Sequence, residues 1–446
     1  MPVFIPLLFF LCGLFLPAIR AYRNFFLASS SLSFFLGVTC INYIYTHPDQ
    51  VPVNYPWLLQ NIDKNSPLDI AIWSLIPLFF NVLLPVLLSI KIRSLVPTAF
   101  VSAFAVKDAK PQGLQITLFL IVLISLLGYI YLSGGLQSAL IEAWLIRRGI
   151  SAADVTFAPV KLFLSALAFN CTAIWIIFAI NNSTDQFGKI VYRHPLSPLF
   201  VAKILLNFKI LVPVVFSVAS ALLMAGRGNT IQFVEVYIFF MAFKQSRLQL
   251  LFFYPFIHYS LASASEAYSY FRSFLLNAEQ VFASSGSLVY EPPARIANDF
   301  LNDSVIFRVN IESHLLLGNV NVDIFRTGEY ITNLVKGSYQ LYSWDSSQPF
   351  ALLDSFVSFM GVTGIPIAVL ASAICIAIPD QIIRKKASFE SDFVYISMLY
   401  ISLNAIRSIL ISPGFGSIVL QSILLPFSIL LIIFFCSRQY TPGYPQ

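Results

Sequence analysis

The feature that most constrains this chain is a series of long apolar stretches that recur along its length. Each holds about 18 or more predominantly apolar residues, which as a helix crosses roughly 30 Å of hydrocarbon. The stretches are continuous rather than alternating, and in lipid a backbone satisfies its own hydrogen bonds only as a helix or a closed barrel. Because 58% of the residues are hydrophobic and 11% are charged, the sequence predicts an all-α integral membrane protein.

We expect about eleven transmembrane helices, and the ninth is long enough to tilt or to break at Gly361, Gly364 or Pro366. The segment 136–150 is interpreted either as a helix lying at the membrane interface or as a short connecting helix. The chain then divides into N-terminal membrane helices (1–269), one large polar loop between spans eight and nine (270–349) and C-terminal membrane helices (350–446). The expected spans are 4–18, 26–44, 70–90, 113–133, 159–181, 210–225, 229–243, 248–268, 350–378, 391–411 and 417–436.

The basic residues predict the orientation of the chain. The loops after spans one, three, five, seven and nine, with the C-terminal tail, hold more than half of the 27 Lys and Arg residues in short clusters. Lys and Arg mark the cytoplasmic side of a membrane protein, so we expect the C-terminus in the cytoplasm and the large loop outside. The net charge of +6 is therefore attributed to orientation, and no nucleic-acid partner is expected. The five cysteines lie in apolar stretches without paired spacing, so we expect neither a disulfide framework nor a metal site.

Four charged residues fall near the outer ends of predicted spans: Arg227, Glu235, Asp354 and Arg407. A charge at such depth costs several kcal/mol unless it is paired or hydrated, so charges of this kind tend to line a polar cavity. The arginines also fit as interface anchors whose side chains reach the surface, and the acids as their partners between helices. Because all four share one depth, we favour an outward-facing polar pocket.

The large loop mixes arginines, acids and aromatic residues. Arg295, Arg308 and Arg326 occur there together with His314. Arginine forks bind phosphate, and aromatic faces lie against sugar rings, so this composition suits a ligand with both parts. A solvated loop has a similar composition, and both interpretations stay open at this point.

Three segments carry a resemblance to a known family. They are Leu223–Gly228, with a glycine-flanked Arg227; Arg308–Gly318, which ends in Leu-Gly; and Leu352–Gly364, which ends in Gly-Val-Thr-Gly. Together with the expected topology, they resemble the repeat-unit polymerases of bacterial O-antigen and exopolysaccharide assembly, which are related to the O-antigen ligases. The last motif of many members opens with a histidine, where this chain has Phe350.

The resemblance implies transfer of a growing glycan from its polyprenyl pyrophosphate carrier to a sugar hydroxyl of another lipid-linked repeat unit. This would occur at the outer face of the bacterial cytoplasmic membrane, in a pathway that includes a flippase and a chain-length regulator. Arg227, Arg308 and Arg407 are candidates to stabilise the departing pyrophosphate, with Arg295 and Arg326 as further binding candidates. With Phe350 in the histidine position, Asp354, Glu235 or His314 is left as the base.

The chain has no Asp-x-Asp pair of the kind that holds a divalent ion on a nucleotide sugar, so we expect a metal-independent reaction without a cofactor. Three alternatives remain. A ligase or another glycosyltransferase with a polyprenyl donor belongs to the same enzyme class. A transporter or flippase of lipid-linked glycan is the second, although such folds often show internal repeats and the two halves of this chain show none that is convincing. A membrane receptor or structural protein is the third.

Overall fold

The computed structural model describes residues 22–50, 65–95, 111–140, 142, 158–191, 208–224, 292–317 and 352–384, with short pieces at 398, 400–402, 424–425 and 428–429. Within these ranges the chain forms helices and short turns, and it contains no strand. The all-helical class is therefore confirmed for the described part of the chain.

Several helices overlap predicted spans. They are α2 (Tyr22–Thr46), α7 (Pro111–Leu132), α9 (Ala158–Val191), α11 (Phe208–Met224) and the continuous α4–η2–α5 run (Pro67–Ile92). Helix α9 extends ten residues beyond the predicted end at 181. Among the described residues, three helices are long and apolar enough to cross a membrane: Pro67–Ile92, Gln115–Leu132 and Leu352–Ile382. The predicted total of eleven spans includes many residues outside the described ranges.

Helix α7 shows why these helices suit a membrane. One face is apolar and buried, and the face turned away from the protein is apolar as well. A surface helix of a water-soluble protein carries polar residues on its exposed side, so an exposed apolar stripe of this kind fits contact with lipid. The buried face comprises Leu118, Val122, Leu126 and Tyr129, and the exposed face comprises Ile116, Leu120, Ile124 and Leu127.

The α4–α5 run begins with an N-terminal helix cap at Ser66. Ser66 accepts a hydrogen bond from the Asp69 backbone at 3.2 Å and donates its hydroxyl to the Asp69 carboxylate at 2.7 Å, with Pro67 at the start of the helix. After α4 (Pro67–Leu78) the chain makes a π turn, η2 (Phe79–Leu83), and continues as α5 (Leu84–Ile92) and η3 (Arg93–Leu95). Pro85 lacks an N–H and crowds the preceding turn, so the wider turn lets the helix continue past it.

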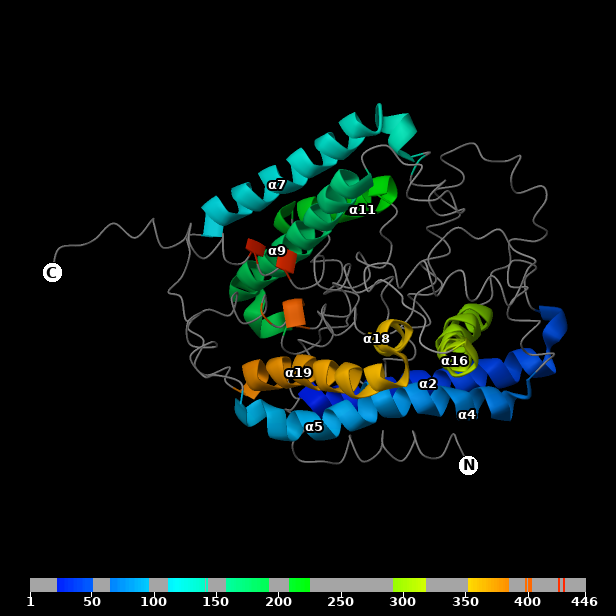
Figure 1. The fold of residues 1–446 in the computed structure, drawn as a ribbon. Helices are drawn as coiled ribbons and strands as arrows, with labels where there is room; N and C mark the ends of the chain where they lie inside the picture. Colours follow the sequence, from blue (N-terminus) through cyan, green and yellow to red (C-terminus); the bar gives the residue numbers. More distant parts are fainter. Residues whose placement is uncertain are drawn as a thin grey trace.

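One layer of the molecule consists of α2, α4–η2–α5 and α19 (Gly364–Arg384), which run side by side (Figure 1). The first turn of α2 lies beside the last turns of α5 and α19, because Arg23, Arg93 and Arg384 all reach Asp380. Helix α2 is thus antiparallel to the other two. The basic ends of these three helices therefore meet at the same end of the layer.

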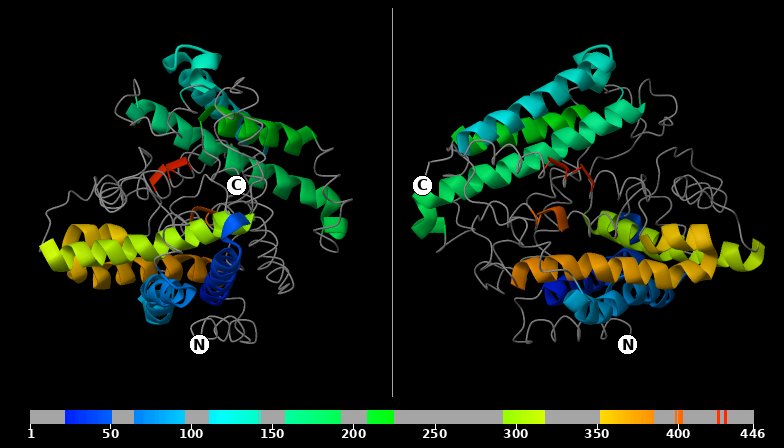
Figure 2. Two further views of the ribbon diagram at one scale, coloured as in Figure 1. Left: turned by 90° about the vertical axis from the view of Figure 1, so that its right-hand side faces the viewer. Right: turned by 60° about the vertical axis from the view of Figure 1, so that its left-hand side comes forward.

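Helix α16 (Pro292–Leu317) runs across the other end of this layer, as the two views of Figure 2 show. Its first half packs Ala294, Ala297 and Leu301 against the last turns of α2 and the start of α4. Gly37 of α2 makes this approach possible, because a Cβ at that position would overlap the ring of Phe300. The segment predicted as a large polar loop therefore contains a 26-residue helix.

Of the two possibilities considered for span nine, a tilt or a break, the structure shows a break. Helix α18 (Leu352–Met360) ends in a 3₁₀ turn, η6 (Gly361–Thr363), after which the chain turns into α19 (Figure 1). Gly361 has φ +63°, in the left-handed region that favours glycine. At Gly364 a Cβ would overlap the backbone carbonyl of Phe356, so glycine is needed there for the two helices to approach.

A second group is formed by α7, α9 and α11. Helices α7 and α9 are antiparallel, since Ser133 after α7 and Lys161 in the first turn of α9 both bind Glu142. The Lys161 ammonium lies 2.6 Å and 2.8 Å from the two Glu142 oxygens, and Ser133 donates to Glu142 at 2.7 Å. Residues 136–140, in the segment for which two kinds of helix were considered, are helical.

Candidate functional site

The candidate site is a set of buried polar side chains where α16 meets α18. We call it the α16–α18 polar layer and define it by residues that are each at most 8% exposed. On both helices the polar residues recur at spacings of three or four, which places them on one face. The layer comprises Asn310, Ser313, His314, Asp354, Ser355 and Ser358.

Asn310 makes the hydrogen bonds that join the two helices. It is fully buried, and its Nδ2 donates to the backbone carbonyl of Asp354 and to the hydroxyl of Ser358, each at 2.9 Å. The Ser313 hydroxyl donates to the backbone carbonyl of Asn310 at 3.0 Å within α16. Around these bonds, Phe307, Leu353 and Val357 form an apolar shell. Asn310 therefore fixes how α18 sits on α16.

His314 lies one turn after Asn310 on the same face of α16. Burial lowers the pKa of its imidazole below the ordinary value of 6.5, and a hydrogen bond with the Ser358 backbone opposes this in part. The imidazole is therefore neutral near pH 7 and able to accept a proton. Asp354, in the first turn of α18, is 3% exposed. The structure thus brings together two of the three predicted base candidates in one layer.

Two polar atoms of the layer have hydrogen-bonding capacity to spare. Asn310 Oδ1 and Ser355 Oγ are shielded from solvent and make no hydrogen bond within the described part of the chain. A buried polar atom left in this way costs about 1–3 kcal/mol. A buried atom in this state calls for an explanation, and a water molecule or a polar ligand held in the layer would supply the missing hydrogen bonds.

Arg308, a predicted phosphate ligand, faces the α4 side of α16. Its Nε donates to Glu312 at 2.8 Å, its Nη1 donates to Asn65 at 3.4 Å, and its guanidinium lies 5.2 Å from the centre of the Trp73 ring. The side chain is 39% exposed. In this conformation Arg308 fastens α16 to α4, while Asn310 and His314 face α18.

The other predicted site residues are placed only in part. Arg295 belongs to the first turn of α16. Glu235, Arg227, Arg326 and Arg407 lie outside the described residues, so the outward-facing pocket of four charges stays a prediction.

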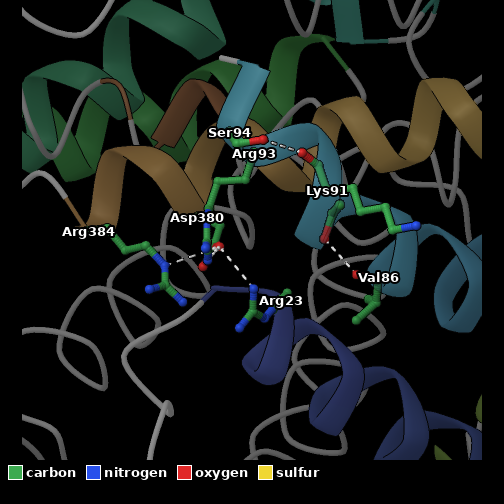
Figure 3. Close-up of polar contacts among 8 residues, drawn as sticks. Arg23, Val86, Lys91, Arg93, Ser94, Asp380 and Arg384 are labelled. Carbon is green, nitrogen blue, oxygen red and sulfur yellow. Dashed lines mark hydrogen bonds and ion pairs between the residues drawn. The ribbon is translucent and has the colours of Figure 1, made fainter. Parts of the chain in front are cut away.

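Sequence reasoning missed two features of the molecule. Asn310 and Ser358 are neutral and drew no attention, although their helical spacing from His314 and Asp354 was available as a signal. The second is Asp380, on which three arginines converge (Figure 3). A lone acid in an apolar span, close to basic residues at its end, was the signal there.

Comparisons of this chain with protein family models, with curated proteins and with solved structures give no match.

Proposed function

We propose that this chain polymerises polyprenyl-pyrophosphate-linked oligosaccharide repeat units at the outer face of a bacterial cytoplasmic membrane. The observation that supports this most is that His314 and Asp354 are both buried in the α16–α18 polar layer, where Asn310 binds the Asp354 backbone. Helix α16 belongs to the predicted outer loop, and α18 opens the span that follows it. These are two of the three segments that resemble the polymerase family, and they lie in contact.

In the proposed reaction, the hydroxyl oxygen of the acceptor sugar attacks the anomeric carbon of the donor glycan. The bond between that carbon and the pyrophosphate oxygen breaks, and the carrier leaves as polyprenyl pyrophosphate. The hydroxyl proton passes to the Asp354 carboxylate or to the neutral His314 imidazole, a step that typically contributes about 10²- to 10⁴-fold to the rate. Arg227 and Arg407 remain the candidates to stabilise the charge that develops on the pyrophosphate.

The position of the polar layer also fits this reaction. Along α19, Asp380 lies 16 residues after Gly364, which corresponds to about 24 Å of helix. The polar layer and the three arginines around Asp380 thus lie at opposite ends of the bundle, and the charge rule assigns the arginine end to the cytoplasm. A polar layer at the outer end is where a lipid-linked substrate that has already crossed the membrane would be bound.

The test is gel analysis of lipid-linked glycan in cells that lack this gene. The cells are complemented with the wild type, with Asp354→Asn, with His314→Gln or with Asp69→Asn. The last is a matched control, because it makes the same chemical change at an exposed position at the same end of the bundle. We expect a ladder from the wild type and from Asp69→Asn, and accumulation of a single repeat unit with Asp354→Asn or His314→Gln.

Two results would contradict the proposal at different levels. A full ladder from both site variants, with normal amounts of protein, would remove the layer as the site while leaving polymerisation open. An unchanged ladder in the deletion strain would remove polymerisation itself.

A transporter of lipid-linked glycan is the second candidate, favoured by the broken helix α18–η6–α19. Discontinuous helices of this kind are common at the substrate sites of transporters. The same deletion strain separates the two functions, because loss of a transporter leaves repeat units at the inner face, whereas loss of a polymerase leaves single units at the outer face. A ligase is distinguished by an intact lipid-linked ladder that fails to reach its final acceptor.

A further inference from the structure

Three helices bring an arginine to the same carboxylate at the end of the bundle opposite the α16–α18 polar layer (Figure 3). Asp380 Oδ2 lies 3.3 Å from Arg93 Nη1, 3.4 Å from Arg384 Nε and 3.8 Å from Arg23 Nη1. The arginines come from the ends of α2, α5 and α19, so this cluster joins segments that are far apart in the sequence. We call these four residues the arginine cluster.

The charges of the cluster do not balance. Asp380 is 1% exposed, and a carboxylate at such a position needs a cation, but a single guanidinium meets that need. Three guanidiniums around one carboxylate leave an excess of two positive charges among the described residues. All three contacts go to the same oxygen, so the arginines also repel one another. A further anion would relieve this repulsion.

Arg23 offers a donor for such an anion. Its Nη1 is shielded from solvent and makes no hydrogen bond within the described ranges, and its contact with Asp380 is the longest of the three. Arg93 and Arg384 are 26% and 37% exposed, so their remaining N–H groups are open to a ligand from outside the bundle. Guanidinium groups bind phosphate oxygens through paired hydrogen bonds, which a cluster of three is well suited to supply.

The depth of the cluster indicates where the phosphate comes from. One candidate span ends at Ile92, directly before Arg93, and another ends at Ile382, two residues before Arg384. The arginines therefore lie where the apolar part of the helices stops, which is the level of the lipid headgroups. Basic pockets between membrane helices at this level bind anionic headgroups.

We propose that the arginine cluster binds a phosphate group, supplied by the headgroup of an anionic phospholipid in the leaflet opposite the α16–α18 polar layer. The phosphate lies against the exposed sides of Arg93 and Arg384 and accepts a hydrogen bond from Arg23. The bound lipid thereby neutralises the excess charge and holds the ends of α2, α5 and α19 together.

The test measures lipid binding to the purified full-length protein in detergent by native mass spectrometry. Phosphatidylglycerol is titrated against phosphatidylcholine, whose phosphate is balanced by its own choline cation. The variants are Arg93→Gln and Arg384→Gln, with Lys91→Gln as the matched control. Lys91 is exposed and lies two residues from Arg93. Its substitution removes one positive charge, as the arginine variants do, but removes none of the three ion pairs with Asp380.

We expect the wild type to bind phosphatidylglycerol more tightly than phosphatidylcholine. Each arginine variant should weaken phosphatidylglycerol binding about fivefold, the effect of about 1 kcal/mol for one basic residue near a membrane surface. Lys91→Gln should change binding less than about twofold, because an exposed charge beside the cluster contributes only a screened, long-range attraction.

Inorganic phosphate is titrated in parallel to separate the two sources of the phosphate group. One contrary outcome is that inorganic phosphate binds and loses affinity in Arg93→Gln and Arg384→Gln, while phosphatidylglycerol binds no more tightly than phosphatidylcholine. In that case the cluster binds a soluble phosphate and the lipid assignment is overturned. If neither ligand is preferred over phosphatidylcholine, or if Lys91→Gln loses as much as Arg384→Gln, the cluster is no phosphate site. Arg384 is the most exposed of the three, so its variant is the one best placed to fold, and size-exclusion chromatography checks this.

Discussion

At the scale of residues, His314 and Asp354, the two candidate bases, differ in the surroundings that determine whether each can accept a proton. His314 is buried and held against the Ser358 backbone, so its imidazole is neutral near pH 7 and its ring is oriented by α18. Asp354 sits in the first turn of α18, where the helix dipole favours the carboxylate. Of the two, His314 is therefore the side chain whose neutral state accepts a proton without prior ionisation.

The lowered pKa of His314 gives a pH dependence with a defined sign. Its pKa is lower in the folded protein than in the unfolded chain, so folding favours the neutral ring. This stabilisation is complete above about pH 6.5, the unfolded value, and is lost as the pH falls through and below it. We expect the thermal midpoint of the purified protein to fall between pH 7.5 and pH 5.5, and less steeply in His314→Gln.

His47→Gln serves as the control for this measurement, since His47 is exposed near the end of α2. The slope of the thermal midpoint against pH should depart from that of the wild type by more in His314→Gln than in His47→Gln. Equal slopes of the thermal midpoint against pH for the wild type and His314→Gln would contradict this prediction, because the protonation of His314 would then not affect stability.

Sequence reasoning reached Asp354 and His314 because a titratable side chain stands out in its surroundings. It did not reach Asn310, whose two hydrogen bonds to α18 depend on how α16 crosses a helix that begins 35 residues after α16 ends. Likewise, the composition around Arg308 suited a phosphate ligand, but its contact with Trp73 follows from the packing of α16 on α4. Its ion pair with Glu312 is local to α16.

At the scale of elements, the break between α18 and α19 is the feature that orients the polar layer. The sequence offered a break at Gly361, Gly364 or Pro366 as one of two possibilities, the other being a tilted span, because the apolar run is long. The helix α16 was not predicted, since its polar residues are frequent enough to resemble a solvated loop. Its apolar contacts with α2 and α4 stabilise the helix, and those contacts are tertiary.

The close approach at Gly364 leads to a test of the break. In Gly364→Ala the new methyl group would overlap the Phe356 carbonyl, so α18 must move relative to α19. Overpacking of this kind costs about 1–3 kcal/mol. We expect a lower thermal midpoint and, under the proposed function, loss of the polysaccharide ladder.

Gly128→Ala is the matched control, because its methyl group would meet only the end of the flexible Leu164 side chain at 3.3 Å. That variant should keep both the midpoint and the ladder. A Gly364→Ala protein with an unchanged midpoint would mean that α18 shifts at no cost and that the break is not closely packed.

At the scale of the whole molecule, the two ends of the bundle differ in chemistry. One carries the arginine cluster, and the other carries α16 and the polar layer. The prediction of spans and of their alternation came from continuous apolar stretches and from the positions of charged residues, which are local properties of the chain. The meeting of Arg93 with Asp380, 287 residues away, depends on the packing of three helices and was beyond such reasoning.

The orientation predicted by the charge rule is tested by labelling single added cysteines with a membrane-impermeant maleimide. Leu316→Cys lies on α16, where the native side chain is 84% exposed, and Ser94→Cys lies beside the arginine cluster. We expect Leu316→Cys to react in right-side-out vesicles and Ser94→Cys only in inverted ones. The wild-type protein gives the background from native thiols. Labelling of both positions from one side would contradict the arrangement of α2, α5 and α19 across the membrane.

The separation of Arg93 and Asp380 along the sequence also sets the order in which the two residues are synthesised. A ribosome adding about 5–20 residues per second reaches Asp380 roughly 15–60 s after it has made Arg93. During that interval Arg23 and Arg93 have no access to the carboxylate that they later share. The early helices must therefore enter the membrane with these two cations still facing the headgroups, and the basic end of the bundle closes only when α19 arrives.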